Sequence, residues 1–140
     1  MTRLVVLDNE AIAALANPHH PKHRTALGYL ELVKLRKKRA VAISILAPTA
    51  VRVEAGWDRN AAQWAFLNRL RISDVVLDTA CANKAAGIRE QAHVSVADAH
   101  IGAAVQSASD ADITVVTSDP EDITAYAATL GHADIAIEQI

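Results

Sequence analysis

The sequence predicts an α/β fold, a three-layer α/β/α sandwich in which helices cover both faces of a mostly parallel sheet. Short apolar segments typical of buried strands alternate along the chain with longer segments of helical composition, and this alternation is characteristic of parallel sheets. The chain has 140 residues, of which 51% are hydrophobic, so it can bury one mainly aliphatic core. We therefore expect one domain that spans residues 1–140.

Five segments indicate strands. Arg3–Asp8, Ala40–Ile45 and Ile113–Val116 are short aliphatic runs, which is the pattern of parallel strands buried on both faces. Val75–Leu77 is a brief extended segment between two helical ones. Ala133–Ile140 alternates apolar and polar residues and predicts a strand at the edge of the sheet.

Helices are predicted between these strands. Prolines at positions 18 and 21 separate the first two helices, because proline cannot continue a helix. Pro48 fits the first turn of a helix, and the pair Asp119-Pro120 fits an N-cap followed by a first turn. The predicted helices are Asn9–Ala16, Lys22–Arg39, Pro48–Gly56, Asn60–Leu70, a helix from Asp78 or Thr79 to Gln91, Ser95–Ser107, and one that begins at Asp119-Pro120.

The charge of the chain limits how it could bind nucleic acid. The formal net charge is −2, so such binding would need a local basic patch rather than a basic molecule. The run Lys34–Arg39 contains five cations and could contact phosphates. It could equally be a solvated helix end, where cations suit the helix dipole.

The cysteine content and the N-terminus favour the cytoplasm. Cys81 is the only cysteine, so no internal disulfide can form, as is usual in a reducing compartment. The chain reaches the carboxylate of Asp8 after only four apolar residues, fewer than a signal peptide needs. No apolar run has the length of a membrane span, and we expect no membrane partner.

Four acidic residues are candidates for one shared site. Asp8 ends the first predicted strand, Asp119 follows the strand before the last helix, and Glu54 and Asp98 interrupt apolar helical segments. Ligands of parallel sheets bind beyond the carboxyl ends of the strands. Each acid also has a purely structural explanation. Asp119 could cap a helix, Asp98 could stabilise a helix N-terminus, and Glu54 could pair with an arginine, either Arg52 or Arg59.

Carboxylates that meet at one edge of a sheet repel one another unless a cation lies between them. Mg²⁺ and Mn²⁺ prefer oxygen ligands of this kind. One or two such ions can lower the pKa of a bound water and stabilise the leaving oxygen of a phosphodiester. The acids therefore predict a divalent-metal site that could hydrolyse phosphodiesters without a cysteine, serine or histidine nucleophile.

The order of these segments resembles the PIN-domain family, and within it the VapC-type toxins. The matching segments are Val5–Asp8, Ile43–Glu54, Asp98–Ile101 and Val115–Ile123. Each motif is short, and the resemblance depends on all four in this order along nearly the whole chain. It implies a PIN-like nuclease domain that cleaves single-stranded RNA with Mg²⁺ or Mn²⁺, forms a homodimer and is silenced by a cognate antitoxin.

The resemblance also implies roles for individual residues. By position, Asp8, Asp98 and Asp119 correspond to metal ligands, and Glu54 to a further ligand or to the group that orients the attacking water. The residues that correspond to supporting positions are Asn9, Ser118 and Asp122. Asn9 stands where the family often has Thr or Ser, and the segment between Asp8 and Glu54 is somewhat longer than is usual.

Two other functions remain open. The chain could be a catalytically inactive binding module of the same fold, whose acids are structural. It could also be a phosphoryl-transfer enzyme with Asp8 as nucleophile. Against this last possibility, Asp8-Asn9-Glu10 lacks a second aspartate two residues on, and the five glycines are isolated rather than gathered in a phosphate-binding loop.

Overall fold

The computed structural model describes residues 2–37, 42–108, 112–127 and 135–140. Five strands in these ranges form one sheet in the order β3-β2-β1-β4-β5, and every neighbouring pair is parallel. The strands are β1 (Thr2–Leu7), β2 (Ala42–Pro48), β3 (Ile72–Val75), β4 (Asp112–Thr117) and β5 (Ile135–Gln139). The helices are α1 (Asn9–Ala16), α2 (His23–Lys37), α3 (Thr49–Ala55), the 3₁₀ turn η1 (Ala62–Trp64), α4 (Ala65–Arg69), α5 (Thr79–Ala92), α6 (Val96–Ser107) and α7 (Pro120–Ala127).

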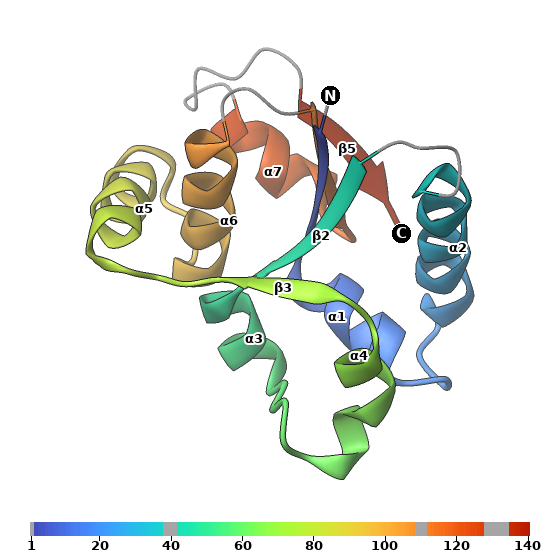
Figure 1. Cartoon of the computed structure of the whole chain (residues 1–140). Coiled ribbons are helices and arrows are strands. Elements are labelled where there is room, and N and C mark those ends of the chain that lie inside the picture. Colours follow the sequence, from blue (N-terminus) through green and yellow to red (C-terminus); the bar gives the residue numbers. More distant parts are fainter. Residues whose placement is uncertain (1, 38–41, 109–111, 128–134) are drawn as a thin grey trace.

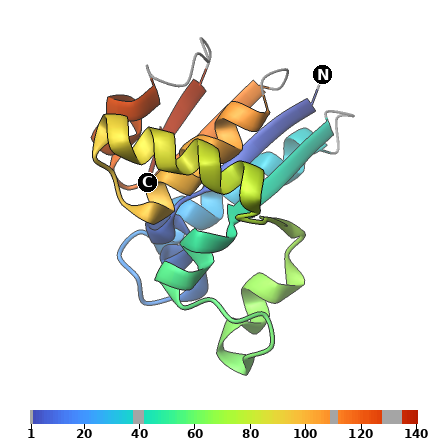
Figure 2. The same cartoon turned by 90° about the vertical axis from the view of Figure 1, so that its left-hand side faces the viewer.

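The sheet lies between two layers of helices, which confirms the predicted α/β/α sandwich. In Figure 1, α2 lies on one side of the sheet, and α5, α6 and α7 lie on the other. Figure 2 shows α5 crossing in front of the sheet, while α4 lies away from the strands at the far end of the molecule. No helix of the described part combines the length and the apolar character that a bilayer crossing requires.

β1 occupies the centre of the sheet because its sequence tolerates burial on both faces. Val5, Val6 and Leu7 are each at most 1% exposed, as the uninterrupted aliphatic run predicts. Helix α1 follows at once and buries Ile12 and Leu15 in the same core. The strand end and the start of α1 are therefore a rigid place for a functional side chain.

Several predicted helix boundaries are confirmed. Helix α1 begins and ends where the sequence predicts. Asp78 caps α5 by accepting a hydrogen bond from Cys81 N at 2.8 Å, and Ser95 caps α6 by accepting one from Asp98 N at 3.1 Å. Gly56 ends α3 with a φ of 73°, a left-handed conformation that costs glycine little.

Three predictions need correction. β2 continues to Pro48, which pairs with Val75 of β3, so Pro48 precedes the first turn of α3 instead of lying in it. Asn60–Leu70 is not one helix: it divides into η1 and α4 at Trp64, whose ring stacks on Trp57 with the centroids 6.3 Å apart. The third extended segment is Ile72–Val75, shifted towards the N-terminus relative to Val75–Leu77, since Ile72 packs in the core whereas Val76 is 64% exposed.

The predicted edge strand is β5, which pairs only with β4 among the described strands. Parts of three predicted elements lie outside the described residues: positions 38–39 of the second helix, 40–41 of the second strand and 133–134 of the last strand.

Candidate functional site

Asp8 lies at the carboxyl edge of the sheet, between its two central strands. Leu7 of β1 is in register with Val116 of β4, and Asp8 N donates a hydrogen bond to Val116 O at 3.1 Å. The carboxylate accepts a hydrogen bond from Ala11 N at 2.7 Å and thereby caps α1. Only 8% of Asp8 is exposed, so the strand end holds a nearly buried acid.

The surroundings of Asp8 both penalise and stabilise its charge. Burial raises the pKa of the Asp8 carboxyl, and the nearby charge of Glu10 raises it further. Hydrogen bonds from the Thr117 side chain, Ala11 N and Ser118 N act in the opposite direction. Burial prevails, so the pKa of Asp8 lies above its usual value.

Thr117 is a site residue that sequence reasoning missed. It is 1% exposed. Its side chain hydrogen-bonds Asp8, and its Oγ1 also accepts a hydrogen bond from Asp119 N at 2.9 Å. Ser118, which the resemblance gives as a supporting residue, bonds Asp8 through its backbone N–H. Only the parallel register of β1 and β4 reveals that Thr117 is the neighbour of Asp8.

Asp98 lies in the first turn of α6, half-buried beside its cap Ser95. Burial is the main cause that raises the pKa of the Asp98 carboxyl, and a hydrogen bond with the Ser95 side chain partly opposes it. The charges of Asp122, Glu54 and Asp8 raise the pKa further. Acids from three other elements, α7, α3 and the start of α1, are therefore within electrostatic range of Asp98.

Glu54 is exposed near the end of α3. It accepts a hydrogen bond at Oε1 from Asn9 Nδ2 at 3.1 Å. Arg52 and Arg59 both bind Asp74 instead, at 2.8 Å and 2.7 Å, so the alternative of an arginine partner for Glu54 is wrong. The hydrogen-bond partner of the Glu54 carboxylate is therefore an uncharged amide, which does not neutralise its negative charge.

Asp119 is exposed and caps α7. Its Oδ1 accepts a hydrogen bond from Asp122 N at 3.3 Å, as the structural explanation of this acid predicts. Asp122 is the acid of this pair whose charge raises the pKa of Asp98. Both acids come from the segment that follows β4, whose first residue Ser118 hydrogen-bonds Asp8.

The acidic residues have the oxygen donors that a divalent cation prefers, but they do not form a complete coordination shell. Within the described ranges, no three His, Cys, Asp or Glu side chains stand ready to hold a metal ion together. Mg²⁺ usually keeps several waters and takes only one or two protein carboxylates. The half-buried Asp98 and the buried Asp8, whose charges interact, supply two such oxygen donors.

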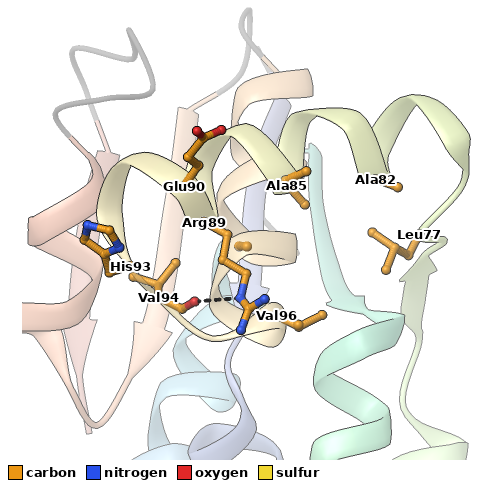
Figure 3. A pocket seen from close by; sticks show the side chains of 10 residues that line it. Leu77, Ala82, Ala85, Arg89, Glu90, His93, Val94 and Val96 are labelled. Atoms are coloured by element: carbon orange, nitrogen blue, oxygen red, sulfur yellow. Dashed lines mark hydrogen bonds between the residues drawn. The ribbon is translucent and has the colours of Figure 1, made fainter.

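Two adjoining hollows lie on the surface near α3, α5 and α6, and Glu54 lines the smaller of them. A hollow of about 410 Å³ is lined by α3 residues that include Ala50 and Glu54, together with Leu77, Val96 and Ala97. A larger one of about 660 Å³ shares Leu77 and Val96 and extends along α5 and α6. Figure 3 shows its mainly apolar lining, with Arg89 bonded to Val94 O at the rim. An apolar surface therefore continues from the acidic edge.

The sequence has no match among protein-family models or curated proteins. Solved structures resemble it. One similar chain belongs to the VapBC2 complex of Rickettsia felis bound to a DNA fragment from its promoter, with a TM-score of 0.65, 13% identity and coverage of 98% of both chains. Another belongs to a toxin–antitoxin complex from Klebsiella pneumoniae, with a TM-score of 0.64 and 15% identity over 97% of this chain and 99% of that chain. At such identities the likeness concerns the fold, and the chain therefore has the PIN-like α/β/α fold that its sequence predicts.

Proposed function

We propose that this protein is a Mg²⁺- or Mn²⁺-dependent endoribonuclease that cleaves single-stranded RNA. The observation that carries the proposal is that Asp122, Glu54 and Asp8, from three separate elements, act on the half-buried Asp98, whose pKa is raised mainly by burial and further by these three charges. Such a cluster is costly to keep at a sheet edge for stability alone. A divalent cation would offset this repulsion.

Each acid has a proposed role. Asp8 and Asp98 are the principal ligands, and Asp119 completes the set from the segment after β4. Glu54 is a further ligand or orients the attacking water, and Asn9 holds its carboxylate through the bond at 3.1 Å. Asp122 adds negative charge beside Asp98. When bound, the ion would polarise the phosphodiester and lower the pKa of a water ligand.

We also propose that the protein is the toxin of a toxin–antitoxin pair and acts in the cytoplasm. Both similar solved chains belong to toxin–antitoxin complexes, which supports an antitoxin partner for a chain of the same fold. The one cysteine, Cys81, is buried and free, as expected in a reducing compartment.

A homodimer is the proposed assembly. Val53 is 82% exposed, Val96 51% and Leu77 36%; all three line the smaller hollow together with Glu54, and Val96 and Leu77 also line the larger one. Exposed apolar side chains gathered in this way commonly mark an interface. Sedimentation at micromolar concentration would show a dimer, and a monomer would rule this assembly out.

The experiment that tests the activity is cleavage of single-stranded RNA. The purified protein should cleave with Mg²⁺, stop when EDTA is added, and resume when Mg²⁺ is restored. Asp8→Asn should lose cleavage while remaining folded by circular dichroism. Cleavage that survives both the chelator and the substitution would rule out the proposed chemistry.

A binding module without catalysis is a second candidate, favoured by one observation. The carboxylates of Asp8 and Asp119 each cap a helix, and the Asp98 carboxyl hydrogen-bonds the side chain of Ser95, the cap of α6. If this is their whole role, the protein should show no calorimetric affinity for Mn²⁺ up to millimolar concentrations and no cleavage of RNA.

A further inference from the structure

His100 is fully buried on α6, two residues beyond Asp98. Its Nδ1 accepts a hydrogen bond from Ala50 N in the first turn of α3, at 3.2 Å. Because Nδ1 accepts, the proton of the neutral imidazole is on Nε2. Within the described part of the chain, Nε2 has no hydrogen-bond partner.

A buried N–H without a partner is uncommon in native proteins and destabilises the fold. An aliphatic side chain at this position would fill the core without that penalty. The bond from Ala50 N to Nδ1 is therefore the feature of His100 that distinguishes it from a leucine, and this bond joins two helices that carry acids.

Helix α3 depends on such contacts for its position. It has seven residues, and its N-cap Pro48 offers no side-chain hydrogen bond. A helix this short is not stable alone, so its neighbours decide where it lies. Ala50 and Glu54 are one turn apart on the same face, and both line the 410 Å³ hollow together with Val96 and Ala97 of α6.

The charges of Glu54 and Asp98 act against this packing. Glu54 contributes to the raised pKa of Asp98, so the two carboxylates repel across the space between α3 and α6. The bond from Ala50 N to His100 links the same two helices one turn away from Glu54. It opposes their separation.

We propose that His100 is a positioning residue, which fixes α3 against α6 so that Glu54 and Asp98 can serve the same divalent cation. This inference rests on the proposed metal-dependent function. On this proposal, the buried imidazole sets the distance between the helices that carry Glu54 and Asp98. His100 itself touches neither cation nor RNA.

The test compares three substitutions that differ in where they place an acceptor. His100→Asn keeps an oxygen at the position of Nδ1, His100→Gln places it near Nε2, and His100→Leu has none. Each variant and the wild-type chain are titrated with Mn²⁺ by calorimetry at constant pH, and each is melted without metal. Exchange of the Ala50 amide hydrogen, measured by NMR, reports the bond itself.

We expect His100→Leu and His100→Gln to bind Mn²⁺ about 10-fold or more weakly than the wild-type chain, the scale typical of residues that orient metal ligands. His100→Asn should remain within about threefold of wild type. The Ala50 amide should exchange faster in the leucine and glutamine variants only. The leucine variant should melt no lower than the asparagine variant.

Three results would overturn the proposal. Equal Mn²⁺ affinity in wild type and His100→Leu would remove the positioning role and leave the proposed function intact. Equal loss in the asparagine and glutamine variants would show that the Nδ1 acceptor is not the cause, and this pair decides the matter if the leucine variant fails to fold. Absence of Mn²⁺ binding by the wild-type chain would remove both the proposed function and this role.

Discussion

The side-chain amide of Asn9 donates a hydrogen bond at 3.1 Å to the carboxylate of Glu54, which lies 45 residues further along the chain. Asn9 directly follows Asp8, so the end of β1 supplies both a buried acid and the donor that holds an exposed one. Arg52 and Arg59 are bonded to Asp74, and the uncharged amide leaves the negative charge of Glu54 in place for a cation.

Asn9→Asp should destabilise the metal-free protein. The new carboxylate would face Glu54, and two unit charges about 4 Å apart near water repel by about 1 kcal/mol. A double-mutant cycle with Glu54→Gln isolates this effect, because any benefit of an acid at the start of α1 is the same in both backgrounds. Urea unfolding should give a coupling of about 1 kcal/mol, and a coupling near zero would contradict the contact.

Asp98→Asn should stabilise the metal-free protein at neutral pH. The pKa of Asp98 is raised, mainly by burial and then by neighbouring acids. A raised carboxyl pKa in the folded state favours folding below the unfolded value of 3.8, and this stability is lost as the pH rises through the folded pKa. The asparagine variant should therefore unfold at higher urea than wild type at pH 7, and the difference should shrink at pH 4.

With Mg²⁺ at pH 7, the wild-type chain should become more stable than Asp98→Asn. The ion would bind the folded wild-type chain and raise its unfolding midpoint, with a smaller effect on Asp98→Asn. Both proteins are treated with EDTA to remove bound metal and are then unfolded in urea with and without added Mg²⁺. Identical midpoints with and without Mg²⁺ in the wild-type chain would count against a site at Asp98.

Asp74→Ala should cost about 1–3 kcal/mol of unfolding free energy, because it leaves two partly buried guanidinium groups without their carboxylate. Asp74 accepts from Arg52 Nη1 at 2.8 Å and from Arg59 Nη2 at 2.7 Å. Both guanidinium groups also lie over the ring of Trp57, at 5.3 Å and 4.5 Å from its centroid.

The matched control is Asp112→Ala. Asp112 pairs with Arg3 at 4.0 Å on the surface, and such pairs contribute about 0–1 kcal/mol. Similar losses in the two variants, measured by urea unfolding, would show that the cluster around Asp74 does not brace α3 against β3.

The sequence predicts the parts of the fold whose pattern is local. The aliphatic run before Asp8 predicts the central strand, and the order of apolar strands and helices predicts the sandwich. The division of Asn60–Leu70 falls at Trp64, whose stacking on Trp57 is a tertiary contact that a helical pattern does not contain.

The residues of the candidate site likewise divide into those that local sequence reveals and those that only tertiary contacts reveal. Asp8, Asp98 and Glu54 can be selected one by one from their apolar surroundings. Thr117 cannot, because its role depends on the register between β1 and β4. Nor can the partner of Arg52, since Asp74 is 22 residues away on another element, or the bond from Ala50 N to His100, which spans 50 residues.

The most direct measurement is a Mn²⁺ titration of the wild-type chain, Asp8→Asn and Asp98→Asn, followed by the electron paramagnetic resonance signal of the free ion. The shared-cation account predicts that wild type binds Mn²⁺ with millimolar or tighter affinity and that each variant binds about 10-fold or more weakly. A wild-type chain that leaves all Mn²⁺ free, or variants that bind as wild type does, would contradict it.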